Sequence, residues 1–298
     1  MMAGPSYSDL PKPKKPHRLD KDTRHEDGIV RFRDRETNIK RDIRRAKLLE
    51  DTSQLTIWEA ERARDLQERL QRANETGIPA ETLASAVYHR EARMPILSSW
   101  WKLIEEHQDQ PQGFVTLRPQ GMLYRADDLF SVRPADLLKR VQNDFNRQGI
   151  TAAPGFGFFG LDADFDANRY GGVIDFHVHG IVVGEKIKAI DNLKKMRKYD
   201  NARLDPLEQG LPISPRIQVK KPLFNLPDPI TYCLESWVPH RPTRIVEEGS
   251  RKRSTTKKEI PSPFKQRWLI WMDMWSIVDF ILLSNLRPTK AGFQLIHP

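Results

Sequence analysis

Residues 171–184, GGVIDFHVHGIVVG, constrain the fold more than any other run, because nearly every position is apolar or β-branched. A short apolar run that is bounded by glycine predicts a strand. The run follows the turn-forming residues ANRYGG, and these follow a second strand-like run, GFGFFGLDADFD. We therefore expect an antiparallel hairpin near the middle of the chain, one arm of which carries His177 and His179.

Helical patterns surround this hairpin. Apolar residues at three- and four-residue spacing predict helices over 36–74, 80–107 (broken or kinked at Pro95) and 133–149, while FVTL at 114–117 predicts a further strand. Downstream, helices are expected over 185–204, from Asp228 onward and over 263–286. The sequence thus predicts an α+β fold with a central antiparallel sheet and flanking helices, a helical N-terminal extension and a helical C-terminal tail.

Changes in composition divide the chain into segments. The expected segments are a disordered basic arm (1–35), a helical extension (36–110), the sheet domain (111–240), a basic linker (241–262) and a helical tail (263–298). Five tryptophans, at 100, 101, 268, 271 and 275, fall in the helical segments, and their spacing favours core packing over base stacking.

The overall charge indicates the class of partner. The 298 residues carry a formal charge of +9, which favours phosphate polymers or anionic membranes as partners. No apolar run approaches the length of a membrane span, and the N-terminus lacks the apolar segment of a signal peptide, so nucleic acid is the expected partner. The single cysteine, Cys233, excludes a disulfide within the chain and a zinc ribbon, and a cytoplasmic location is the default.

His177 and His179 are two residues apart on the predicted strand, so both side chains project from the same face. Two imidazoles and a carboxylate form a ligand set for a divalent cation. Asp162, Asp164 and Asp166 share one parity on the other arm of the hairpin, and Asp175 shares the parity of the histidines. We expect one of the first three to be the third ligand, and we favour Asp164, because it lies mid-run and leaves room for the turn.

Three motifs in this order resemble the HUH endonucleases, a superfamily named after a histidine–hydrophobic–histidine motif on a strand. His177-Val178-His179 fits that motif, FVTLR at 114–118 resembles the upstream strand motif, and Tyr232 in DPITYCLESW lies where the family has its tyrosine. The resemblance covers roughly residues 111–240. Arg118 stands where the first motif ends in Thr, and Glu235 stands where replication initiators often carry Lys.

The resemblance implies an enzyme that nicks and joins single-stranded or hairpin DNA through a 5′-phosphotyrosine. Tyr232 would be the nucleophile, and His177, His179 and Asp164 would bind Mg²⁺ or Mn²⁺, although the ligand types also suit zinc. Tyr232 is expected in the first turn of its helix, near the positive end of the helix dipole. Tyr199 is the competing candidate, and Tyr170 in the hairpin turn is less favoured. The implied role is initiation of rolling-circle replication of a plasmid or phage, with host replication proteins as further candidate partners.

Other interpretations stay open at this stage. A single-strand DNA transposase of the same superfamily would carry the same motifs, and an inactive DNA-binding protein could keep the fold alone. The run IDFHVH also resembles the first strand of amidohydrolase and PHP-type hydrolase barrels, but only 119 residues follow His179. Basic clusters at 194–198, 219–221 and 250–253 are either part of a DNA-binding surface or ordinary solvated faces.

Overall fold

The computed structural model describes residues 34–168, 171–208, 211, 214–223, 228–235, 238–240, 242–245, 251–253, 258–289 and 292–296. The α-helices are α1 (Arg35–Leu49), α2 (Ile57–Thr76), α3 (Ala86–Glu106), α4 (Pro134–Arg147), α5 (Lys186–Ile190), α6 (Asp228–Tyr232) and α7 (Phe264–Asp273). The strands are β1 (Gln112–Leu117), β2 (Leu123–Arg125), β3 (Phe156–Asn168), β4 (Gly171–Val183), β5 (Ile217–Lys220), β6 (Thr243–Ile245), β7 (Arg251–Arg253), β8 (Ile281–Ser284), β9 (Leu286–Thr289) and β10 (Gly292–Leu295).

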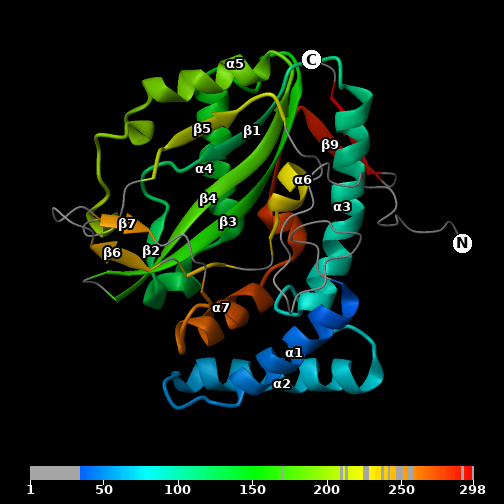
Figure 1. Ribbon diagram of the computed structural model, residues 1–298, viewed down its shortest axis with the longest axis vertical. Coiled ribbons are helices and arrows are strands. Elements are labelled where there is room, and N and C mark those ends of the chain that lie inside the picture. Colours follow the sequence, from blue (N-terminus) through cyan, green and yellow to red (C-terminus); the bar gives the residue numbers. More distant parts are fainter. Residues whose placement is uncertain are drawn as a thin grey trace, which may run out of the picture.

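A central antiparallel sheet with helices around it confirms the predicted fold class (Figure 1). Its strand order is β5-β1-β4-β3-β8, and β2 also pairs with β4, in line with β1. The expected hairpin is present: β3 and β4 pair along their whole lengths, from Phe156 opposite Val183 to Asn168 opposite Gly171. This hairpin is the longest ladder of the sheet and carries the histidines.

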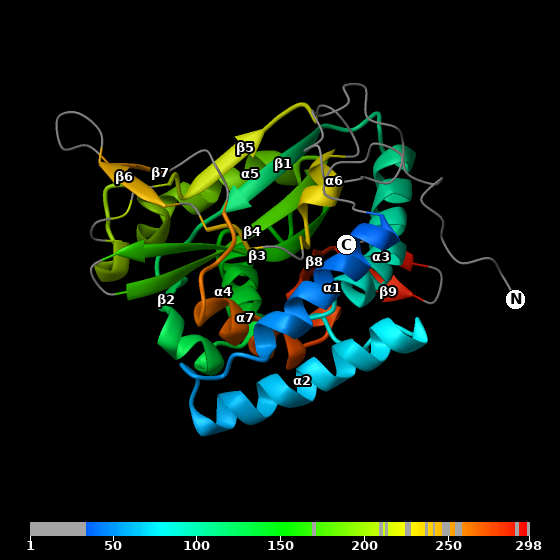
Figure 2. The same cartoon turned by 60° about the horizontal axis from the view of Figure 1, so that its bottom comes forward.

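The two faces of the sheet are covered by different helices (Figures 1 and 2). On one face, Phe145 of α4 meets Phe159 of β3 edge-on, and Phe176 of β4 packs against Trp271 of α7. On the other face, Trp100 of α3 stacks on Phe158 with ring centroids 4.1 Å apart, and α6 also packs here. Because side chains alternate along a strand, His177 and His179 belong to the face of α3 and α6.

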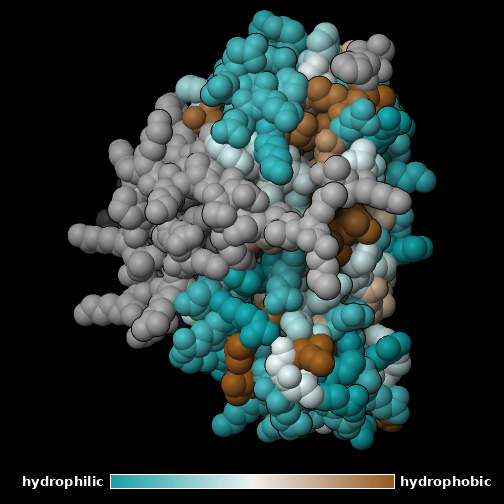
Figure 3. All heavy atoms as spheres, turned by 90° about the vertical axis from the view of Figure 1, so that its right-hand side faces the viewer, coloured by the Kyte–Doolittle hydropathy of each residue, from teal (hydrophilic) through white to brown (hydrophobic). Residues whose placement is uncertain are grey.

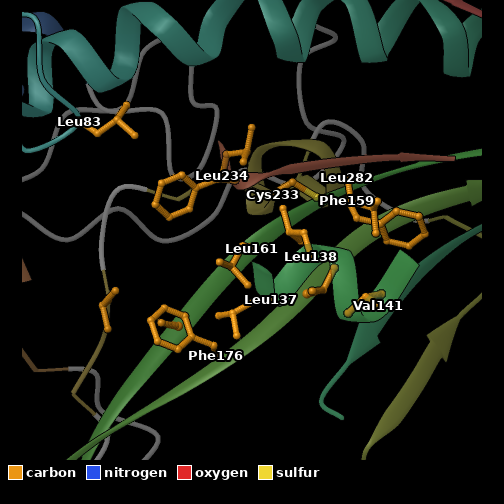
Figure 4. Close-up of a cluster of buried hydrophobic side chains, with 14 of the residues drawn as sticks. Leu83, Leu137, Leu138, Val141, Phe159, Leu161, Phe176, Cys233, Leu234 and Leu282 are labelled. Carbon is orange, nitrogen blue, oxygen red and sulfur yellow. The ribbon is translucent and has the colours of Figure 1, made fainter. Parts of the chain in front are cut away.

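One cluster of buried apolar side chains connects all these layers. Figure 4 shows the part of it where the sheet meets α4 and the residues that follow α6. It draws on α1, α2 and α3 as well as on the sheet, α4, α6, α7 and β8, so the predicted segments 36–110 and 263–298 do not have separate cores. Trp100 and Trp271 are fully buried in it and Trp268 nearly so, which confirms that these tryptophans are core residues. The indole of Trp271 donates to the carbonyl of Val132.

Several expected helices have different bounds. The pattern over 36–74 forms two helices, because Thr56 and Glu59 make a capping box that starts α2. Helix α3 continues through Pro95, whereas the helix expected over 185–204 stops at Ile190 and gives way to 3₁₀ turns.

The expected C-terminal helix over 263–286 is also shorter than predicted, because α7 ends at Asp273. A 3₁₀ turn that is capped by Ser276 and Asp279 follows, and Ile281–Ser284 then pairs with β3 in the central sheet. Alternating burial along these four residues is the pattern of a strand at a sheet edge. The tail therefore contributes a strand to the sheet as well as a helix.

Some predictions fall outside the described residues. These are the basic arm up to residue 33, Tyr170, and much of the linker over 241–262. Within the described residues, no helix has both the length and the apolar character needed to cross a membrane. On the face shown in Figure 3, apolar side chains form small groups among hydrophilic ones.

Candidate metal and nucleophile site

His177 and His179 lie side by side on β4, with their rings edge-on and 4.6 Å apart at the centroids. His177 Nδ1 lies 2.9 Å from the carbonyl oxygen of Asp175. A carbonyl only accepts, so Nδ1 carries the proton and Nε2 has a lone pair for a metal. Burial lowers the pKa of His177 to about 4, and the charge of Arg118 adds to this effect, so the imidazole is neutral near pH 7.

His179 is oriented by the neighbouring strand. Thr116 lies opposite it on β1, and Thr116 Oγ1 is 2.9 Å from His179 Nδ1. This contact aims Nε2 toward β3. Thr116 is the Thr of the FVTLR motif, so the first two motifs of the resemblance meet here in a direct side-chain contact.

Asp162 is the carboxylate that lies beside both histidines. It stands directly opposite His177 in the β3–β4 ladder. Its Oδ2 is 3.9 Å from His177 Nε2 and 3.6 Å from His179 Nε2. The three residues form a group that could hold a metal ion, with ligand atoms within 4.8 Å of one another.

Asp164, the favoured candidate in the sequence, has a different neighbour. It lies opposite Asp175, and its Oδ2 accepts from Nη2 of Arg118 at 3.1 Å. Asp166, one step further, accepts from Thr243 Oγ1 at 2.8 Å. That Asp164 is a metal ligand stays a prediction, but the geometry favours Asp162, because Asp162 lies beside both Nε2 atoms.

The spacing of the three side chains suits a divalent cation. Two donors that are each about 2.1 Å from one ion lie about 3.0–4.2 Å apart for bond angles between 90° and 180°. The separations of 3.6 and 3.9 Å fall in that range. Two imidazoles and one carboxylate leave coordination positions for water or substrate. The residues therefore fit the metal that the sequence led us to expect.

Tyr232 lies over this group. Its ring is edge-on to His179 with centroids 4.5 Å apart, and edge-on to Phe114 at 5.7 Å. Helix α6 begins at Asp228, as the sequence predicts, but it has only five residues and Tyr232 is the last of them. Leu234, with a left-handed φ of 62°, is part of the turn that follows. The helix dipole therefore gives no support to a phenolate at this position.

Tyr199 is on the opposite side of the sheet. Its hydroxyl donates to Asp144 Oδ2 of α4 at 3.0 Å, and the side chain is buried. Burial, together with the neighbouring charge of Asp144, raises the pKa of Tyr199 well above its ordinary value. Of the candidate tyrosines in the described residues, Tyr232 is the one that the fold brings to the histidines.

Arg118 is the part of the site whose role the sequence did not reveal. It directly follows β1, and its guanidinium contacts Asp164 and Asp175. Burial alone would lower its pKa, but Asp175 and Asp164 more than offset this and raise it. The sequence did contain a signal for this role. Arg118 stands where the first motif of the family ends in Thr, so a cation replaces a neutral residue in a domain that also carries a run of aspartates.

A scan against protein-family models found no match, and searches of curated proteins and of solved structures returned no similar protein.

Proposed function

We propose that this chain is a metal-dependent endonuclease and strand transferase of the HUH type, which cuts single-stranded DNA with Tyr232. The observation that carries the proposal is the position of Tyr232, whose ring lies 4.5 Å from His179. Three motifs that together span more than a hundred residues of sequence converge at this point, from β1, β4 and α6. Such convergence supports a reactive site better than any one motif does.

Each group then has a defined task. When a divalent cation is bound, it polarises the scissile phosphate as a Lewis acid. His177, His179 and Asp162 hold it, and Thr116 and the carbonyl of Asp175 orient the two imidazoles. Tyr232 stands on the same face of the sheet, where its oxygen can approach the phosphate.

The proposed reaction is a transesterification. The Tyr232 oxygen attacks phosphorus as its phenolic proton passes to solvent, the bond from phosphorus to the 3′ oxygen breaks, and that oxygen takes up a proton. The products are a 5′-phosphotyrosine and a free 3′ hydroxyl. No phosphodiester energy is lost, so the strand can be rejoined or transferred to another 3′ end.

Exposed basic residues at the end of β5 and on the turns after α5 support a nucleic-acid substrate. Lys220 and Lys221 are exposed at the end of β5, the strand next to β1. Lys194, Lys195 and Arg197 are exposed on the 3₁₀ turns after α5. Their charges would neutralise backbone phosphates and make binding depend on salt.

An inactive DNA-binding protein is the second candidate, and one observation favours it. His177 is 1% exposed and His179 is 4% exposed, so a phosphate can reach them only if covering side chains move. Barrel hydrolases are disfavoured, because the sheet is open and antiparallel, while those enzymes use a closed barrel of parallel strands. Replication initiation and single-strand transposition would use the same site, and we propose the former as the role.

The decisive experiment is detection of a covalent adduct. The full chain is incubated with Mn²⁺ and 3′-labelled single-stranded DNA, both as a random-sequence library and as the DNA that flanks its own gene. A labelled band that survives denaturation at the size of the protein is expected, because the phosphotyrosine carries the 3′ fragment.

The histidines provide the controls. The double variant His177→Ala/His179→Ala should lose the adduct at least a hundredfold while it keeps DNA binding. DNA binding without any adduct from the parent chain would instead support the inactive protein. An undiminished adduct in the double variant would contradict the metal site.

A further inference from the structure

A second acidic position lies next to the histidine site and is filled by an arginine. Asp164 and Asp175 face each other across β3 and β4, on the same face as Asp162 and His177. Arg118 bridges them, with Nη1 at 2.5 Å from Asp175 Oδ2 and Nη2 at 3.1 Å from Asp164 Oδ2. All three side chains are nearly buried, at 11%, 8% and 9% exposure.

Two carboxylates in this position need a cation. Like charges directly opposite each other on neighbouring strands destabilise a sheet, and burial increases the repulsion. Asp164, Asp175 and His177 also form a second group whose ligand atoms lie within 4.8 Å of one another. By residue type and spacing, this group would itself suit a divalent ion, and it shares His177 with the first group.

Arg118 is held firmly in place. Its backbone N–H donates to the carbonyl of Arg216 at 2.7 Å, which ties it to the chain just before β5. Asp175, whose carboxylate contacts Arg118, accepts a hydrogen bond from His177 Nδ1–H with its backbone carbonyl oxygen. The position of the guanidinium is thus linked to the orientation of one of the metal-binding histidines.

We propose that Arg118 is a built-in cation that fills the second acidic position, so that the site takes a single divalent ion at Asp162, His177 and His179. Arg118 is then a positioning residue: it fixes Asp175 and, through it, His177. This inference rests on the proposed function only in taking the first group as the metal site.

Counting bound Mn²⁺ tests the inference, by calorimetry on the full chain and by electron paramagnetic resonance of the free ion. The parent should bind one ion. Arg118→Met should bind two, because both carboxylates are released and nothing replaces the guanidinium. Arg118→Lys, which keeps the charge, should still bind one. Asp164→Asn should bind one with affinity within about threefold of the parent, whereas Asp162→Asn should weaken binding at least tenfold.

The outcomes separate the two proposals. One ion of unchanged affinity in Arg118→Met would overturn the role of Arg118 and leave the proposed function intact. In a second outcome, the parent binds no Mn²⁺, Arg118→Met binds one ion, and adding Asp164→Asn to that variant removes the ion. This outcome would support the role of Arg118 and overturn the proposed metal site. If Arg118→Met fails to fold, Asp164→Asn decides, since loss of the parent's ion in that variant would make Asp164 a ligand and overturn the inference.

Discussion

Tyr199→Phe should lower the stability of the fold and leave the DNA-cutting reaction intact, whereas Tyr232→Phe should abolish the reaction. The Tyr199 hydroxyl donates to Asp144, which is 1% exposed, and Lys198 contacts the other carboxylate oxygen at 2.6 Å. A hydrogen bond to a charged group contributes about 1.5–3 kcal/mol, so Tyr199→Phe should cost about 2 kcal/mol. At Tyr232, phenylalanine keeps the ring contacts with His179 and Phe114.

These energies convert to measurable melting shifts. The entropy of unfolding is about 2.1 cal/mol/K per residue, or about 0.6 kcal/mol/K for 298 residues. A loss of about 2 kcal/mol then lowers the melting temperature by about 3 °C in Tyr199→Phe. Tyr232→Phe should still fold, because the ring contacts with His179 and Phe114 remain.

The adduct assay should give the reverse pattern. Tyr199→Phe should keep the labelled, denaturation-resistant band, and Tyr232→Phe should lose it while it still binds DNA. A band that survives in Tyr232→Phe and disappears in Tyr199→Phe would refute the choice of nucleophile. Survival in both variants would refute the tyrosine mechanism, and an unchanged melting temperature in Tyr199→Phe would refute the energy assigned to its hydrogen bond.

Three further predictions use other parts of the molecule. Affinity for single-stranded DNA, measured by fluorescence anisotropy, should fall with a log–log salt slope of about −4 if about six phosphates are neutralised, and a flat response would contradict the basic surface. Burial holds the pKa of His89 well below its ordinary value, so below about pH 6.5 the unfolded chain binds a proton that the folded chain does not. The contribution of neutral His89 to stability is therefore present above about pH 6.5 and is lost as pH falls below it. His89→Gln should flatten this dependence of the unfolding free energy on pH, as measured by denaturant titrations. Gly180→Ala should lower stability by about 1–3 kcal/mol, because its Cβ would lie 2.1 Å from the Phe159 ring, whereas Gly113→Ala, with no neighbour closer than 3.5 Å, should change stability little.

The hairpin and the shared face of its polar residues could be predicted from the sequence, because both depend on a period of two and on a turn signal. His177, His179 and the three aspartates indeed lie on one face. Which aspartate meets the histidines depends on the register, and the register depends on the geometry of the turn. Asp162 and Asp164 are two residues apart, so the two-residue period of a strand places both on the same face. The period alone therefore cannot tell which of them lies beside the histidines.

The short elements were harder to predict, for a related reason. The run ILLS at 281–284 is too short for its periodicity to distinguish a strand from a continued helix, and its pairing with β3 decides the matter. The end of α6 depends on a left-handed residue, Leu234, and leucine gives no sequence signal for that conformation. Arg118 shows its role only when β1 stands next to β4.

The two-residue period leaves the register of the β3–β4 pairing open, so other features must select it. Two glycines, Gly160 and Gly180, disfavour the alternative register for steric reasons. A slip of two residues would bring Asp164 opposite His177 and Asp162 opposite His179, where Gly160 now stands. A Cβ at Gly160 would lie 3.0 Å from the backbone nitrogen of Leu234, so any larger residue there would push away the turn that follows Tyr232. Gly180 sets the same limit from β4, because it leaves room for the ring of Phe159 opposite it. The two glycines thus act with the turn to favour the register in which Asp162 faces the histidines, and the one at 160 also leaves room for the turn that follows Tyr232.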